Sequence, residues 1–203
     1  MTEDQVNYII NTLGKVGIQF DKGLTDAEIG QIEDEFKVNF PPDLKLFLQT
    51  ALPISQNFVN WRQGLGFEQE AAKIMSRIDW PLNGMLFDVK SNGFWIDSWG
   101  LMPESIDDRI SIAKTAYQEY EKLIPIYSHR YIPSLPNEND NPVFSVYQMD
   151  IIYYGYNLPG YFSNEFKFSL RDDFEILREP KKGIKFWTAW IDDRIPFRDN
   201  QTE

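Results

Sequence analysis

The chemistry open to this chain is limited by its single histidine, His129, because the chain has no cysteine. Ser128 precedes this histidine and Arg130 follows it. A serine and a histidine are the minimum for nucleophilic catalysis, but neighbours on a strand point to opposite faces of a sheet. We therefore expect no catalytic pair between Ser128 and His129. A nearby Arg130 would also disfavour the protonated imidazole. We predict no catalytic residue and no enzymatic activity.

Metal and cofactor sites lack their usual ligands. A zinc site needs more histidine and cysteine side chains than the chain contains. The acidic run 137–141 lacks the alternating spacing and the distal glutamate of a calcium loop. Glu104, Asp107 and Asp108 fit the favourable charge at a helix N-terminus better than a metal site. The glycines of 64–66 are too few for a dinucleotide fingerprint. We expect no metal and no cofactor; a hydrolase built on paired carboxylates stays open, since 31 acids offer many pairs.

Aromatic and polar residues that bind rather than react are the remaining candidates. Tyrosine, tryptophan and arginine anchor protein interfaces when they are exposed. Such residues lie on two predicted strands and within the aromatic segment 81–100. The alternative interpretation is that the tyrosines only cover the sheet and that the tryptophans pack in the core. The candidate partner-binding residues are Tyr127, His129, Arg130, Tyr131, Tyr153, Tyr154, Trp95 and Trp99.

Composition indicates an acidic protein with a sizeable core. The chain has 203 residues, of which 42% are apolar, and a formal net charge of −11. This charge argues against direct nucleic-acid binding, which needs a basic surface. It serves either solubility or the attraction of a cationic partner, such as a basic toxin or nuclease. The lack of cysteine excludes a disulfide framework and favours an intracellular location.

Neither a signal peptide nor an apolar stretch of membrane-spanning length is visible. We therefore expect a cytoplasmic protein. The length suits one domain, and no linker divides the chain. We predict a single domain over 1–203, in which 1–23 form an N-terminal helical extension.

The stretch 24–52 predicts two helices joined by a proline corner. Thr25 is a good N-cap, and Glu28 three residues later completes a capping box. The first helix should end near Lys37, and the second should begin at Pro42, since proline suits the first helical position. Helices of this length are not stable alone in water, so both must pack on the rest of the domain. Their apolar faces comprise Ile29, Ile32, Phe36, Leu44, Phe47, Leu48 and Ala51.

Helical and extended patterns alternate in the rest of the chain, which predicts an α+β fold. The central sheet should be mainly antiparallel, with about four to six strands, and backed by helices. The segment 55–66 is predicted to be a loop. Helices are predicted over 2–13, 68–78, 103–123 and 184–191. Strands are predicted over 85–89, 94–96, 124–132, 143–147 and 151–154, the last two at the centre of a covered sheet.

The opening helical pair resembles the start of the SUKH superfamily, which contains the fungal Smi/Knr glucan-synthesis regulator and many bacterial immunity proteins. The family pattern is a capped helix with Ile-x-x-Ile-Glu, an extended link, a proline corner and an aromatic-rich helix. An Ile-Pro-Ile strand at 124–126 and the pair Phe186–Trp187 also resemble family members. In the family such a strand leads into a pair of strands and a closing helix, so the resemblance implies that a closing helix starts over 161–168. The family's turn after the second helix is replaced here by 52–55, and 56–100 carries the least resemblance. The matching residues of the opening are Ile29, Ile32, Glu33, Phe40, Pro41, Leu44, Phe47 and Leu48.

The resemblance implies a single SUKH domain that binds a protein and has no enzymatic activity. In bacteria, it implies an immunity protein that neutralises a cognate toxin, often a nuclease, by covering it. The fungal members imply instead a regulatory or scaffold protein in cell-wall glucan signalling. A third hypothesis, from the residues, is a small-molecule or glycan binder, or a hydrolase, that uses the region of Trp95 and Trp99.

Overall fold

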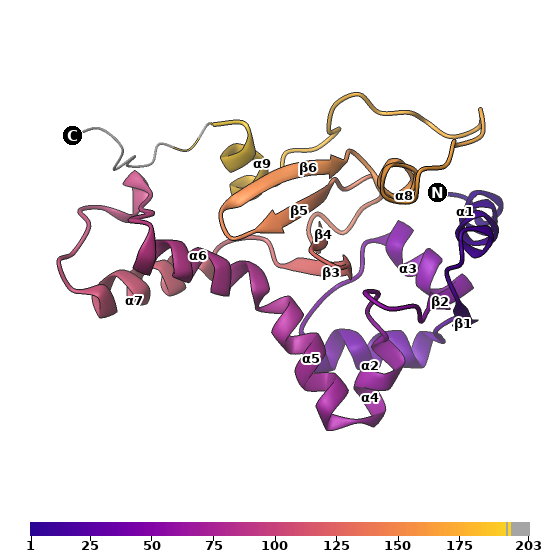
Figure 1. The fold of residues 1–203 in the computed structure, drawn as a ribbon, viewed down its shortest axis with the longest axis horizontal. Helices are drawn as coiled ribbons and strands as arrows, with labels where there is room; N and C mark the ends of the chain where they lie inside the picture. Colours follow the sequence, from indigo (N-terminus) through magenta and orange to yellow (C-terminus); the bar gives the residue numbers. More distant parts are fainter. Residues whose placement is uncertain (194, 196–203) are drawn as a thin grey trace.

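The computed structural model describes residues 1–193 and 195. Within this part of the chain the predicted α+β fold is confirmed, since helices surround a four-stranded antiparallel sheet in the order β3-β4-β5-β6, and β1 pairs with β2 (Figure 1). The helices are α1 (Glu3–Lys15), α2 (Asp26–Phe36), α3 (Pro42–Thr50), α4 (Trp61–Gly66), α5 (Glu68–Ile78), α6 (Trp80–Ser91), η1 (Asp97–Trp99), α7 (Ile106–Tyr117), α8 (Leu158–Phe166) and α9 (Lys185–Ile191). The strands are β1 (Phe20–Lys22), β2 (Ala51–Pro53), β3 (Leu123–Tyr127), β4 (Arg130–Pro133), β5 (Val143–Tyr147) and β6 (Asp150–Gly155).

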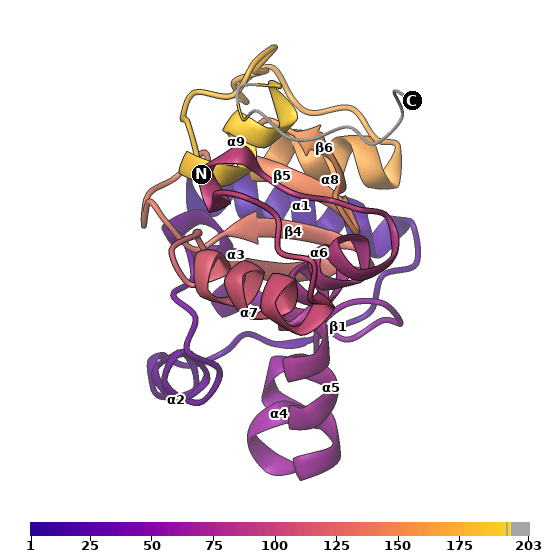
Figure 2. The ribbon, with the colours of Figure 1, turned by 90° about the vertical axis from the view of Figure 1, so that its left-hand side faces the viewer.

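Both faces of the four-stranded sheet are covered by helices. Alternate strand residues point to opposite faces, so Ile132 and Val143 belong to one apolar cluster, while Tyr131 and Phe144 belong to another. The first cluster contains the apolar faces of α1, α2, α3 and α8, and the second contains those of α6, α7 and α9. Figure 2 shows α4 and α5 projecting away from the sheet. The segment 1–23, expected as a helical extension, supplies α1 and β1, and α1 is part of the first cluster.

The opening helical pair forms as the sequence predicts. The Thr25 hydroxyl accepts a hydrogen bond from the backbone N–H of Glu28, whose carboxylate accepts one from the backbone N–H of Thr25. Helix α2 then ends because Lys37 adopts a left-handed conformation with φ of 53°. Helix α3 begins at Pro42, as expected. This pair supplies one wall of the first apolar cluster.

An ion pair joins the start of α2 to α4. Arg62 Nε lies 2.5 Å from Glu28 Oε1, and Arg62 Nη1 lies 2.8 Å from Asp21 Oδ2. The hydrogen bond from Arg62, followed by the one from the Thr25 backbone, lowers the pKa of Glu28 to about 2 from its ordinary 4.5. The ionised form of Glu28 is therefore favoured by folding.

Glu28→Gln is expected to remove part of the acid sensitivity of this protein. Because the folded pKa lies below the unfolded pKa, ionised Glu28 stabilises the fold above pH 4.5, and this contribution is lost as the pH falls toward about 2. Glutamine keeps the reciprocal capping bond but does not titrate. Urea denaturation at several pH values between 7 and 2 measures the effect. If the free energy of unfolding falls in parallel for wild type and variant below pH 4.5, the result contradicts this account.

Two hairpins build the four-stranded sheet. The predicted turn between β5 and β6 is confirmed, with Gln148 at φ of 54°. The continuous strand predicted over 124–132 is wrong, because the chain turns at Ser128, where φ is 47°, and at His129, and then returns as β4. The central position predicted for both strands of the second hairpin is wrong for β6. This strand lies at the sheet edge and leaves Ile152 exposed.

The segment 55–100 differs most from its prediction. Residues 61–66, predicted as a loop, form α4. The predicted strand 85–89 lies inside α6, and 94–96 lies outside both sheets of the described chain. A short apolar run fits a buried helix as well as a strand. Pro81 in the first turn of α6 was the local signal for a helix.

The boundaries of two further helices also differ. The helix predicted over 103–123 is α7, which is shorter because Ser105 caps its start and it ends at Tyr117. The closing helix predicted over 161–168 is α8. It starts earlier, because the Asn157 side chain accepts a hydrogen bond from the backbone of its third residue. Helix α8 thereby lies against the end of β6.

Candidate functional site

Arg130 contacts Tyr154, another predicted binding residue, but inside the protein rather than on its surface. Its Nε lies 2.8 Å from Glu165 Oε2, and its NH1 donates to Ser145 Oγ at 2.8 Å. Its guanidinium carbon lies 3.6 Å from the centre of the Tyr154 ring. Arg130 is only 8% exposed. The prediction that Arg130 itself contacts a partner is therefore wrong, because its groups join the sheet to α8.

Two tyrosines of the predicted binding set pack in the interior. Tyr131 is 1% exposed, and its hydroxyl donates to the backbone oxygen of Arg77 at 2.8 Å. Burial raises its pKa above the ordinary value. Tyr127 is half-buried and packs against Phe58 and Phe166, with ring centres 4.8 Å and 5.3 Å away. Tyr131 is therefore a core residue, whereas Tyr127 lies at the edge of the core and stays a predicted binding residue.

Ser128 and His129 do meet, contrary to the sequence prediction. Ser128 Oγ lies 3.1 Å from His129 Nδ1, because both residues lie in the turn between β3 and β4 rather than on a strand. Burial, and then the charge of Arg130, lower the pKa of His129. Within the described residues, no carboxylate forms a hydrogen bond with this imidazole to orient it. The pair lacks the third group of a catalytic triad.

Both candidate tryptophans serve the second apolar cluster. Trp95 is 0% exposed, and its indole N–H donates to the backbone oxygen of Gly100 at 2.7 Å. Trp99 is half-buried, packs edge-on against Trp95, and donates to the Tyr120 hydroxyl at 3.0 Å. A stacking platform that uses Trp95 is therefore wrong, since neither face of its ring is open.

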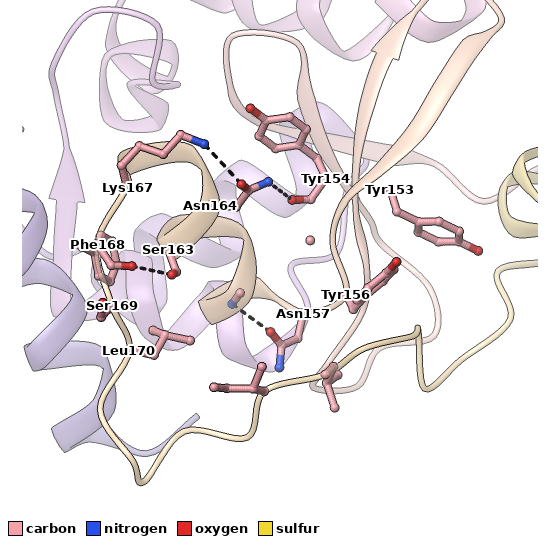
Figure 3. Close-up of a pocket in the computed structure, with 14 residues that line it drawn as sticks. Tyr153, Tyr154, Tyr156, Asn157, Ser163, Asn164, Lys167, Phe168, Ser169 and Leu170 are labelled. Carbon is pink, nitrogen blue, oxygen red and sulfur yellow. Dashed lines mark hydrogen bonds between the residues drawn. The ribbon is translucent and has the colours of Figure 1, made fainter.

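An open hollow lies at the end of β6, where the sequence predicted Tyr153 and Tyr154 as binding residues. Figure 3 shows these tyrosines, with Tyr156, beside α8 and the segment 167–170. The hollow has a volume of about 660 Å³. A second hollow of about 690 Å³ is bounded by Tyr153, Tyr156 and the segment 179–183. The rings of Tyr153 and Tyr156, with centres 5.5 Å apart, thus form a ridge between two hollows.

Tyr156 was missed by the sequence prediction. It follows Tyr153 and Tyr154 after a single glycine, so the run of tyrosines was itself a signal. The predicted binding residues stopped at the end of the predicted strand, although binding residues often lie in the loop just beyond a strand. We call the pair Tyr153 and Tyr156 the tyrosine ridge.

Three polar side chains of the first hollow already serve the fold. Asn157 accepts a hydrogen bond from the backbone of α8, and Asn164 donates to the backbone oxygen of Tyr154 at 3.0 Å. Ser163 donates to the backbone oxygen of Phe168 at 2.5 Å. Small-molecule sites present a few polar groups that converge on the ligand. Here these three groups bind backbone instead, and the hollow also presents the tyrosine side chains and Lys167.

Metal-binding and membrane-spanning features are not found in the described chain. Residues 1–193 and 195 contain no group of three or more histidine, aspartate or glutamate side chains placed to hold a metal ion. Among the same residues, no helix combines the length and apolar character needed to cross a membrane. Comparisons with models of protein families, with curated proteins and with solved structures found no match for this chain.

Proposed function

We propose that this chain is a protein-binding module without enzymatic activity, of the bacterial immunity type, which neutralises a basic toxin by covering it. The tyrosine ridge is the observation that carries the proposal. Tyr153 and Tyr156 stand between two open hollows, so a partner that straddles the ridge gains aromatic contact on both sides. Tyrosine is enriched among the residues that dominate binding energy at protein interfaces.

The charge of the chain supports a basic partner. A net charge of −11 creates a long-range field that speeds encounter with a cationic protein. The same field disfavours nucleic acid, so the partner itself, rather than its substrate, is the expected target. Covering a toxin also needs no reacting group on this chain.

The resemblance to the SUKH superfamily supports the proposal through its opening motif. The capped helical pair that carries the resemblance is formed and buried. The regulatory role of the fungal members would use a protein partner as well. The identity of the partner distinguishes the two roles: a toxin supports immunity, whereas a component of glucan synthesis would contradict it.

Tyr153→Ala together with Tyr156→Ala is expected to lower affinity for the partner by at least about 30-fold, as loss of interface anchors does. The measurement is capture of a basic protein from an extract of the native cell by the tagged chain, in low and high salt. High salt should weaken capture, because it screens the electrostatic attraction between this chain and a basic partner.

Three controls make this experiment specific. Phe67→Ala removes a 65% exposed aromatic ring away from the ridge and should capture normally. Tyr153→Phe with Tyr156→Phe keeps the rings and should retain most of the affinity. Urea denaturation confirms that each variant is folded. Capture that is equal for wild type and the double alanine variant, or no captured protein at all, would contradict the proposal.

A further inference from the structure

A small aromatic notch lies on the opposite end of β6 from the tyrosine ridge, between α6 and the β5–β6 turn. It has a volume of about 190 Å³ and is bounded by Trp80, Asn83, Gly84, Phe87, Tyr147 and Gln148. Trp80 and Phe87 lie seven residues apart, and therefore on one face of α6. Trp80 is 45% exposed, Phe87 is 49% exposed and Tyr147 is 59% exposed. Contiguous exposed aromatic surface of this kind marks interaction sites.

The floor of the notch is rigid. A Cβ atom on Gly84 would lie 2.7 Å from the Cα atom of Gln148, so the turn rests directly on the helix backbone. The Asp88 carboxylate accepts a hydrogen bond from the backbone N–H of Met149 at 2.9 Å. The indole of Trp190 donates to the backbone oxygen of Met149 at 2.9 Å. The turn is thus fixed from both sides, so the backbone that carries the aromatic walls is in place before any ligand binds.

Two acidic residues, Asp79 and Asp150, are direct neighbours of residues that line the notch. Asp150 is paired directly with Tyr147 across the β5–β6 ladder, which places the two side chains on the same face. Asp79 immediately precedes Trp80, and both carboxylates are exposed. Lys90, one turn beyond Phe87 on α6, is an opposing cation. The charge near the notch is therefore negative, as is that of the whole chain.

We propose that this notch receives one arginine side chain of a basic protein partner. Its volume lies below the roughly 300–1,000 Å³ of small-molecule sites, so it suits a single side chain. A planar guanidinium stacks on aromatic faces, best on tryptophan, and donates to carboxylates at the rim. This inference rests on the proposed function, because it takes the partner to be basic, and it adds a second anchoring point beyond the tyrosine ridge.

The direct test uses a short peptide and does not need the partner. Acetyl-Gly-Arg-Gly amide is titrated into the ¹⁵N-labelled protein, and NMR follows the Trp80 indole and the Gln148 amide. The counterpart with citrulline has nearly the same shape but no charge. We expect the arginine peptide to shift both signals and to bind at least about five-fold more tightly than the citrulline peptide. Equal binding of the two peptides, or shifts confined to other residues, would overturn the inference.

A matched pair of variants completes the test. Trp80→Leu with Phe87→Leu should abolish the shift of the Gln148 amide, whereas Phe67→Leu, at an exposed ring elsewhere, should leave it unchanged. In the capture experiment, the notch variant should lose at least about ten-fold in affinity. If a basic protein is captured equally by the notch variant, the inference fails and the proposed function stands. If the arginine peptide binds but no basic protein is captured, the proposed function fails and the basic partner with it, while the arginine site in the notch stands.

Discussion

Phe47→Ala is expected to lower the free energy of unfolding by about 3–5 kcal/mol, the loss typical of a buried phenylalanine. Phe47 is 0% exposed and lies on α3. Its ring centre lies 4.8 Å from that of Phe162 on α8 and 6.3 Å from that of Phe20 on β1. Truncation therefore opens a cavity where three segments meet, and surrounding elements cannot all close it.

Urea denaturation followed by circular dichroism measures this loss. Phe67→Ala is the matched control, because Phe67 is 65% exposed and its truncation should change stability by less than about 0.5 kcal/mol. Phe36→Ala, at the other helix of the opening pair, should resemble Phe47→Ala, since Phe36 is 1% exposed. A loss near zero for Phe47→Ala would show that the helical pair is not part of the core.

Glu165→Leu is expected to destabilise the protein by about 3–5 kcal/mol, because it leaves the Arg130 guanidinium without its carboxylate in a buried position. The side chains of Arg130 and Glu165 are only 10% and 15% exposed. Ser145 and the Tyr154 ring remain as contacts, but neither carries the opposite charge. Breaking a buried ion pair is strongly destabilising even where the pair itself adds little stability.

The double variant Arg130→Met with Glu165→Leu isolates this effect. It removes both charges and is expected to recover at least about 2 kcal/mol relative to Glu165→Leu alone. Urea denaturation of wild type, both single variants and the double variant completes the thermodynamic cycle. Additive losses would contradict the account, since they would mean that Arg130 and Glu165 stabilise the fold independently.

Local signals made much of the fold predictable. Thr25 and Glu28 mark a helix start by their own hydrogen bonds, and Pro42 fixes the next start, so the helical pair follows from residues close in sequence. The hairpin of β5 and β6 and the C-terminal α9 were predicted for similar reasons. Each of these elements has a hydrophobic period that matches its structure.

Tertiary contacts decided the elements that the sequence did not predict. The apolar positions of the run 85–89 suit either a strand or a helix. In the structure the run is helical, and Gly84 of the same helix packs directly against the β5–β6 turn. The turn at Ser128 is held by Arg77, a residue 51 positions away, which donates to the Ser128 backbone oxygen at 2.8 Å. No local pattern indicates such a contact.

The candidate site was predictable in composition but not in placement. Tyr153 and Tyr154, which are predicted binding residues, lie beside an open hollow. Arg130, Tyr131 and Trp95 have the same interface-forming composition, yet all three are buried. Aromatic and arginine side chains occur both in cores and in interfaces. Only the fold determines whether a given side chain is buried or exposed.

Stoichiometric titration of the captured partner tests the central claim most directly. The toxic activity of the purified basic partner is measured as this chain is added, and the complex is then separated in high salt. The account predicts that activity falls linearly to zero at one equivalent and returns when the complex dissociates, because neutralisation is by occupancy. Inactivation by a small fraction of an equivalent, or a partner that stays inactive after separation, would indicate catalysis and contradict the account.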